Sequence, residues 1–177
     1  MIQYMSLIGQ NAKKASLQKV NTKMKNKILK RYASLLDKER NIIINANTKD
    51  IKFALKKGLK NNLIDRLTIN HKDLSGIKDS INKIIKLKDP IDNTLEKWSR
   101  PNGLKIKRVS IPIGVIGVIY ESRPNVTSDV ASLCFKSGNA VILKGGSEAM
   151  NTNKILARLF RKALRENNVD ENFIQFI

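Results

Sequence analysis

Two short apolar runs rich in Val and Ile constrain this chain more than any other feature. Val115–Tyr120 and Ala140–Leu143 do not alternate with polar residues, and that pattern is typical of strands buried on both faces of a parallel sheet. The segment between them begins with turn residues, Ser122–Asn125, and continues with apolar residues at helical spacing. It stops at Ser137–Gly138, where Gly can adopt the left-handed conformation that ends a helix. The sequence therefore predicts a right-handed β-α-β crossover and an α/β fold.

The loops that follow the two runs are where the sequence predicts a ligand site, because ligands bind beyond the carboxyl ends of the strands in open α/β sheets. The first loop, Tyr120–Asn125, carries Asn125 at the tip of a strand. Its side-chain amide suits the stabilisation of an oxyanion. The same amide suits the N-cap of the following helix, and both roles stay open.

The second loop, Lys144–Ser147, holds two glycines between a predicted buried strand and the start of a helix. Backbone N–H groups at a helix N-terminus attract anions, so Gly145 and Gly146 suit a phosphate, with Lys144 placed for ribose hydroxyls or a phosphate. An ordinary strand-to-helix turn explains these residues equally well. Neither GxGxxG nor GxxxxGK[ST] occurs in the chain, and the Gly114–Gly117 spacing indicates close strand packing.

The first ninety residues predict a layer of helices, because apolar residues recur there at spacings of three and four. Asn47 with Asp50 three residues later is typical of a helix start, with the carboxylate near the positive helix end. Asn70 is expected to cap the last helix of the layer, which Pro90 ends. The predicted helices are 6–19, 22–36, 47–58, 61–67 and 70–89.

After residue 90 the pattern changes. We expect a connector over 90–103 and a half-exposed strand over 104–109, where apolar and basic residues partly alternate. Ser147 or Asn151 is expected to open a further helix after the second strand. A new apolar run then begins at about residue 171, and we expect the sequence to stop inside its fold, since two strands make too narrow a sheet.

Composition excludes several classes of protein. The chain has 177 residues, 41% of them hydrophobic, which is enough for a folded domain with a core. We expect a cytoplasmic protein, because neither a membrane span nor a leader pattern is present. The net charge is +19, but the lysines are scattered and aromatic residues are only 5%. The positive charge is therefore better explained by a general enrichment in Lys, Asn and Ile, as in proteins from AT-rich genomes, than by a nucleic-acid partner. We expect neither a nucleic acid nor a membrane as a partner.

Two residues invite a catalytic interpretation and are assigned structural roles. Cys134 is the single cysteine, and it lies late in its predicted helix on the same stripe as Val126 and Val130. Burial there raises the pKa of a thiol, whereas a reactive thiol needs a base, a cation or a helix N-terminus. His71 is the single histidine and lacks an evident orienting partner. A single cysteine gives neither a disulfide nor a metal cluster.

The segment GVIGVIYESRPNVTSDVASLCFKSGNAVILKGGSEA closely resembles the γ-glutamyl phosphate reductase (glutamate-5-semialdehyde dehydrogenase) family, a branch of the aldehyde dehydrogenase superfamily. ANTKDIKFALKKGLKNNLIDRLTIN and RPNGLKIKRVSIPIG also resemble segments of that family. The match is specific because ESRPNVT and KSGNAVILKGG occur together and in the family's order.

The resemblance implies NADPH-dependent reduction of L-glutamyl 5-phosphate to L-glutamate 5-semialdehyde with release of phosphate, a step of proline biosynthesis. In the family mechanism a cysteine thiolate attacks the acyl phosphate, and hydride reduces the resulting thioester. Asn125 matches the Asn that stabilises the oxyanion in the superfamily. Lys144 matches the residue that contacts the adenosine ribose of NADP(H), and Gly145, Gly146, Ser147 and Glu148 complete that cofactor-binding loop.

The resemblance also implies that a large part is missing. The family's nucleophile belongs to a separate catalytic domain beyond position 177, and Cys134 matches a non-catalytic position. We therefore expect 1–177 to be a partial N-terminal cofactor-binding domain, mainly helical over 1–103 and strand-helix-strand-helix over 104–177, and inactive alone. Expected partners are the small-molecule substrate and either another copy in a homo-oligomer or the missing C-terminal half. The alternatives are a non-catalytic remnant or split-enzyme half that binds nucleotide or a partner chain, and a charge-driven nucleic-acid binder.

Overall fold

The structure is a computed structural model, and it describes residues 2–121 and 123–177. The helices of the first half are α1 (Ile2–Ser16), α2 (Thr22–Lys38), α3 (Arg40–Lys56), α4 (Asn61–Leu67) and α5 (His71–Lys86). The elements that follow are β1 (Thr94–Ser99), β2 (Lys105–Val109), β3 (Val115–Ile119), α6 (Pro124–Lys136), β4 (Ala140–Lys144), η1 (Ser147–Ala149), α7 (Met150–Arg165), η2 (Glu171–Phe173) and β5 (Ile174–Phe176). The predicted helical layer over the first ninety residues is confirmed.

Strands β3, β4 and β5 form a parallel sheet in that order. Across β3 and β4, Val115 pairs with Ala140 and Ile119 pairs with Lys144. Helix α6 connects β3 to β4, and η1 and α7 connect β4 to β5. The predicted β-α-β crossover and the α/β class are confirmed, and the apolar run after residue 171 supplies a third strand.

Strand β3 is less buried than the sequence predicts. The Ile119 side chain is 87% exposed and Gly117 is exposed, whereas Val141 and Leu143 on β4 are fully buried. Strand β3 is an edge of the described sheet, and β4 lies between two strands. The prediction of burial on both faces is therefore right for β4 and wrong for β3.

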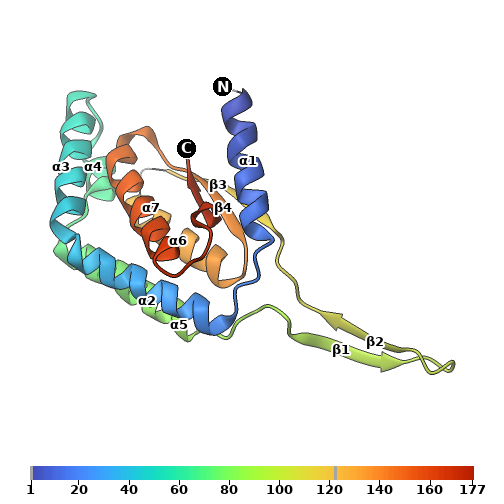
Figure 1. The fold of residues 1–177 in the computed structure, drawn as a ribbon. Helices are drawn as coiled ribbons and strands as arrows, with labels where there is room; N and C mark the ends of the chain where they lie inside the picture. Colours follow the sequence, from blue (N-terminus) through green and yellow to red (C-terminus); the bar gives the residue numbers. More distant parts are fainter. Residues whose placement is uncertain (1, 122) are drawn as a thin grey trace.

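The elements stack in layers around the sheet (Figure 1). Helix α1 lies against one face, and α6 and α7 cover the other face. Helices α2, α3 and α5 then pack on the outer side of α6 and α7. Helices α2, α3 and α5 thus reach the sheet through the two crossover helices, whereas α1 contacts the sheet directly.

An aromatic cluster fills the space between the helical layers. Phe160 of α7 contacts Tyr32 of α2, with ring centroids 4.5 Å apart, and Phe135 of α6 at 5.7 Å. Phe135 also contacts Phe173 at 5.4 Å. The Tyr32 hydroxyl shares a hydrogen bond of 2.6 Å with the Ser128 hydroxyl. Burial raises the pKa of Tyr32, so this hydroxyl stays protonated inside the core.

The buried face of α6 is more polar than the stripe that the sequence predicts. Cys134 is buried, but Val126 and Val130 are half-buried and Leu133 is 48% exposed. The fully or nearly fully buried positions include Thr127, Ser128, Ala131, Ser132 and Phe135. The hydroxyls of Thr127 and Ser128 find partners on α7 and α2. The spacing of the large apolar residues alone therefore did not predict which face of α6 is buried.

The segment expected to be a connector contains a strand. Strand β1 pairs with β2 in an antiparallel hairpin that extends away from the body (Figure 1). Every residue of β1 is exposed, and Ile106 is the half-buried residue of β2. The expected strand over 104–109 is confirmed as β2. It lies outside the parallel sheet, and the hairpin has no buried face that an alternating pattern could reveal.

Candidate functional site

The two loops with the predicted site residues begin side by side. Ile119, the last residue of β3, pairs with Lys144, the last residue of β4. The Tyr120 N–H donates to the Lys144 carbonyl at 3.0 Å. Both loops therefore start at the carboxyl edge of the parallel sheet, where ligands bind in open α/β folds.

Asn125 lies in the first turn of α6 and is exposed. Pro124 occupies the first helical position and Arg123 is the N-cap, so the alternative N-cap role for Asn125 is wrong. Its Nδ2 donates to the Asp129 carboxylate at 3.3 Å. An amide nitrogen has two N–H donors, so one N–H can hold Asp129 while the second remains available to a ligand. Ser122, part of the predicted turn, lies outside the described residues.

Two neighbouring hollows lie along this edge. The Asn125 hollow, of about 590 Å³, is lined by 65–66, 68–69, 72–73, 76–77, 80, 123–125 and 129. The Gly146 hollow, of about 500 Å³, is lined by Leu59, Leu63, Arg66, Glu121, Arg123, Gly146 and Glu148. Arg66 and Arg123 line both, so two exposed guanidinium groups lie between the predicted oxyanion residue and the predicted cofactor loop. Arg123 lies in the loop that the sequence predicts as part of the site, although no role was predicted for it. Arg66 was not predicted, because it comes from the helical layer and carries no local motif.

The remaining residues of the cofactor loop lie beside the hollows. Lys144 is exposed, and its Nζ donates to the Gly145 carbonyl at 3.2 Å. Ser147 is exposed, and its hydroxyl donates to Glu148 at 3.0 Å. Gly146 and Glu148 line a hollow, whereas Lys144, Gly145 and Ser147 line neither of the two. The structure thus brings part of the predicted set together in one concave region.

Gly145 is held in a tight packing position. A Cβ atom there would lie 2.4 Å from Asn153 Nδ2 and 3.0 Å from the Tyr120 hydroxyl. Below it, Tyr120 shares a hydrogen bond of 2.6 Å with Thr127, and Thr127 donates to Asn153 at 2.8 Å. This buried network joins the end of β3 to α6 and α7. Sequence reasoning missed it, although Thr127 and Asn153 lie on the buried faces of their helices.

Asp50 fixes the start of α7, the helix that follows the cofactor loop. Its carboxylate is 1% exposed and accepts four hydrogen bonds of 2.6–3.0 Å, from the backbone N–H and side chain of both Asn151 and Thr152. Asn47 on the same helix accepts from the Ile69 N–H at 2.8 Å and donates to the Leu67 carbonyl at 2.9 Å. The prediction that Asn47 and Asp50 begin a helix is wrong, because both lie inside α3 and satisfy backbone groups of distant segments.

The titratable groups near Asn125 set the electrostatics of its hollow. Burial raises the pKa of Asp129, although the hydrogen bond from Asn125 opposes this rise. Asp65, Asp73 and Asp129 face Arg66, Lys72 and Arg123 around the hollow, so its charges are balanced. Such a site can accommodate a ligand that carries both an anionic and a cationic group.

Cys134 and His71 lie where the structural roles predicted for them require. Cys134 is buried, and burial raises its pKa to about 11, so the thiol is protonated at neutral pH. His71 is exposed in the first turn of α5. Among the described residues, no group of His, Cys, Asp and Glu side chains could hold a metal ion. In the same described ranges, no helix has the length and apolar character needed to cross a membrane.

Comparison with known proteins identifies relatives along nearly the whole chain. Over 161 residues it is 47% identical to gamma-glutamyl phosphate reductase of Persephonella marina, which covers 91% of this chain and 36% of that protein. Over 171 residues it is 45% identical to the same enzyme of Halothermothrix orenii, covering 96% and 41%. The chain is therefore similar in sequence to the N-terminal part of gamma-glutamyl phosphate reductases.

Solved structures agree with this assignment. The crystal structure of gamma-glutamyl phosphate reductase from Thermotoga maritima superposes with a TM-score of 0.93 at 41% identity, covering 96% of this chain and 42% of that one. The Saccharomyces cerevisiae gamma-glutamyl phosphate reductase superposes with a TM-score of 0.90 at 30% identity. An acetylating aldehyde dehydrogenase from Geobacillus thermoglucosidasius, at 17% identity and a TM-score of 0.69, shares the fold. The predicted aldehyde-dehydrogenase-like fold is confirmed.

The similarity to gamma-glutamyl phosphate reductases has a defined extent. The chain spans about two fifths of the length of these curated relatives, between 36% and 41% for the two named above. No family model matches the chain.

Proposed function

We propose that this chain forms part of the site of a reductase that converts L-glutamyl 5-phosphate to L-glutamate 5-semialdehyde and phosphate with NADPH, in proline biosynthesis. One observation carries the proposal: Asn125 and the Gly145–Glu148 loop follow adjacent strand ends that are paired at Ile119 and Lys144. Relatives at 45–47% identity named gamma-glutamyl phosphate reductase support the choice of reaction.

In this proposal Asn125 stabilises the oxyanion that develops on the substrate carbonyl. Its position in the first turn of α6 supports the role, because the partial positive charge of a helix N-terminus adds to that of the amide. Asp129 accepts one amide N–H at 3.3 Å and thereby orients the other. Arg66 and Arg123 line the hollow beside Asn125, where they attract the phosphate or carboxylate of the substrate.

The cofactor loop fits the adenosine side of NADP(H) by the chemistry of its groups. Lys144 brings an exposed ammonium, Ser147 a hydroxyl and Glu148 a carboxylate, which suit ribose hydroxyls and a phosphate. Gly146 lines the Gly146 hollow, and because it has no side chain, a ligand can approach its backbone closely. The chemistry that the cofactor supplies when bound is a hydride, and these residues bind and orient it.

The nucleophile is proposed to come from polypeptide outside these 177 residues. The single cysteine, Cys134, is buried with its pKa raised to about 11 and is therefore a poor nucleophile. The purified chain alone is accordingly expected to show no NADPH-dependent turnover.

A chimera tests the proposal. The portion of the Thermotoga maritima reductase that aligns with this chain is replaced by residues 1–177, and reduction of L-glutamyl 5-phosphate is measured through NADPH oxidation. We expect turnover, and we expect Asn125→Ala to lower it about 100-fold or more. Asn102→Ala, at the tip of the exposed hairpin, is the matched control and should leave the rate unchanged. A folded chimera without turnover, or an unchanged rate in Asn125→Ala, would contradict the proposal.

A second candidate function is a non-catalytic half or remnant that binds nucleotide or a partner chain. Exposed apolar side chains on and before the edge strand favour it, since Ile111, Ile113 and Ile119 are 72%, 83% and 87% exposed. Co-purification of the chain with a separately expressed C-terminal portion of a relative, with restored turnover, would identify a split enzyme. Binding without turnover would favour the remnant.

A further inference from the structure

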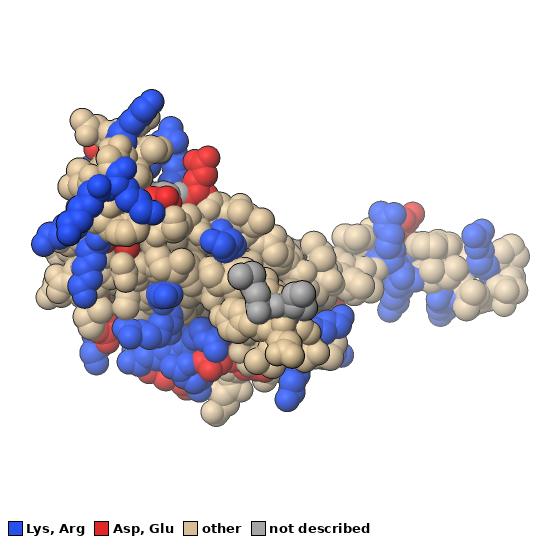
Figure 2. Space-filling view, turned by 90° about the horizontal axis from the view of Figure 1, so that it is seen from above, with Lys and Arg blue, Asp and Glu red and all other residues tan. Residues whose placement is uncertain are grey.

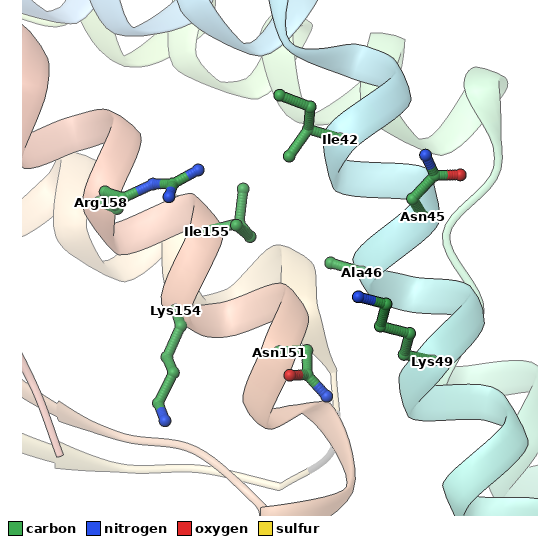
Figure 3. A pocket seen from close by; sticks show the side chains of 8 residues that line it. All are labelled: Ile42, Asn45, Ala46, Lys49, Asn151, Lys154, Ile155 and Arg158. Atoms are coloured by element: carbon green, nitrogen blue, oxygen red, sulfur yellow. The ribbon is translucent and has the colours of Figure 1, made fainter.

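A groove between α3 and α7 lies apart from the site described above (Figure 3). It has a volume of about 490 Å³ and is lined by Ile42, Asn45, Ala46, Lys49, Asn151, Lys154, Ile155 and Arg158. It shares no lining residue with the Asn125 hollow or the Gly146 hollow. A volume of this size is typical of pockets for small organic ligands.

All charged side chains that line the groove are basic. Lys49 comes from α3, and Lys154 and Arg158 come from α7. Figure 3 shows Lys49 and Arg158 reaching into the space between the two helices, with Lys154 directed along the outer side of α7. Asp50, which neighbours Lys49 in the sequence, does not line the groove, and its buried carboxylate is committed to four hydrogen bonds at the start of α7. The groove therefore has a positive lining that contains no acidic residue.

These three cations are like most lysines and arginines of the described residues in making no ion pair. Within the described ranges, none of them makes a hydrogen bond or an ion pair through its side chain. Ion pairs elsewhere engage Lys25, Arg31, Arg40, Lys78, Arg108, Arg161 and Arg165. The hollows at the sheet edge are lined by both acidic and basic residues. Figure 2 shows Lys and Arg spread over one face of the body and along the hairpin, so exposure alone does not single out the groove. The groove differs from the two hollows at the sheet edge because no acidic residue lines it.

The groove also has an apolar floor. Ala46 is buried, Ile155 is half-buried, and Ile42 is 45% exposed at one side. Asn45 and Asn151 add exposed amide groups at the rim. A single inorganic anion would use the cations and leave the aliphatic surface wet. A ligand that joins phosphates to a flat, weakly polar group would use both.

We propose that the α3–α7 groove is a binding site for a nucleoside diphosphate, with the base on Ile42, Ala46 and Ile155 and the phosphates between Lys49 and Arg158. Arginine and lysine are the usual phosphate ligands, and a charge-assisted hydrogen bond is stronger than a neutral one. This site is independent of the proposed reductase chemistry.

Calorimetric titration of the 177-residue chain with ADP tests the proposal, in metal-free buffer at low ionic strength. We expect saturable binding at or below about 1 mM. The double variant Lys49→Ala/Arg158→Ala should weaken it about 10-fold or more, because two charge-assisted contacts are lost. The control Lys30→Ala/Lys52→Ala removes the same charge from exposed positions outside the groove and should leave binding within about 2-fold. Circular dichroism confirms that each variant remains folded.

Two further titrations make the test specific. Pyrophosphate carries at least as much charge as ADP but lacks the base, so we expect it to bind more weakly; equal or tighter binding would overturn the assignment to a nucleotide. Because ADP also suits the proposed cofactor loop, the titrations are repeated in the Lys144→Ala background, where Lys49→Ala/Arg158→Ala should still weaken ADP binding about 10-fold or more. If Lys144→Ala weakens binding and the groove variant does not, ADP binds at the sheet edge and the proposal is wrong. The absence of saturable binding would also overturn it.

Discussion

At the scale of single residues, Gly145 joins the cofactor loop to the core. A Cβ atom at this position would lie 2.4 Å from Asn153 Nδ2 and 3.0 Å from the Tyr120 hydroxyl. Gly145→Ala should therefore lower the free energy of unfolding by about 1–3 kcal/mol, the range for overpacking a tight site. Urea denaturation measures this change.

Gly76→Ala is the matched control for Gly145→Ala. Gly76 lies inside α5, and nothing lies within 4 Å of a Cβ built on it. Alanine favours an α-helix over glycine by roughly 0.5–1 kcal/mol, so this variant should be more stable than the parent chain. A Gly145→Ala protein as stable as the parent would show that the loop can move away from Asn153 and Tyr120.

The buried ion pair between Lys25 and Asp89 gives a pH-dependent prediction. The Lys25 side chain is 4% exposed, and its Nζ lies 3.0 Å from the Asp89 carboxylate. Burial alone would raise the pKa of Asp89, but hydrogen bonds from Lys25, Thr22 and the Ile91 N–H together lower it. Because the folded pKa lies below the ordinary value of about 3.9, this pair adds stability above about pH 4. That stability is lost as the pH falls through the folded pKa.

Lys25→Met should cost about 3 kcal/mol of unfolding free energy near pH 7, since it leaves a buried carboxylate without its cation. The difference from the parent should shrink as the pH falls toward about 3, where Asp89 becomes protonated in the variant first. Urea denaturation at the two pH values measures both effects. The exposed Lys23→Met serves as control, and a cost for Lys25→Met that is independent of pH would exclude the ion pair as its cause.

At the scale of elements, the sequence predicted those parts of the fold that local residues determine. The runs at Val115–Tyr120 and Ala140–Leu143 form strands because their side chains are apolar throughout. Asn70 caps α5 as predicted, and the structure adds a return hydrogen bond from the Asn70 N–H to the Asp73 carboxylate. The predicted crossover also indicated which edge of the sheet holds the carboxyl ends of its strands. It therefore predicted that Asn125 and Lys144 lie at that edge. Their roles in binding and catalysis stay predictions.

Distant partners could not be predicted from local pattern. Asn47 and Asp50 have the spacing of a helix start, yet their hydrogen-bond partners lie about 20 and 100 residues away. Arg66 reaches the site from the helical layer for the same reason. Strand β1 was missed because its residues are all exposed, so no face imposes a pattern.

Asp50 gives a prediction for the start of α7. The N-cap of α7, Ala149, offers no side-chain acceptor, and the Asp50 carboxylate accepts the Asn151 and Thr152 N–H groups instead. Asp50→Ala should lower the free energy of unfolding by about 2 kcal/mol or more, since buried donors lose a charged acceptor. Hydrogen exchange should increase first at these two amides. Asp79→Ala, exposed on α5, should change neither quantity.

At the scale of the whole molecule, the body and the hairpin are expected to behave as separate units. The strands of the hairpin contact each other, and their residues are exposed apart from the half-buried Ile106. Leu95, Trp98 and Leu104 are 60%, 37% and 56% exposed. Replacing residues 95–108 by an Asn-Gly turn should therefore leave the stability of the body within about 0.5 kcal/mol, as for surface changes.

The same deletion tests what the hairpin does. Exposed apolar side chains on a projecting two-stranded ribbon favour contact with another chain, and a second copy is the partner that we propose. Sedimentation equilibrium of the parent chain should then reveal self-association that the deletion removes, while thermal unfolding of the dilute proteins stays the same. If the chain still associates without the hairpin, the hairpin is not the interface. The exposed edge at β3, where Ile119 is 87% exposed, would then be the expected contact. Ile119→Lys would then be the variant that dissociates the chain, because a charge on an edge strand prevents pairing with a neighbour.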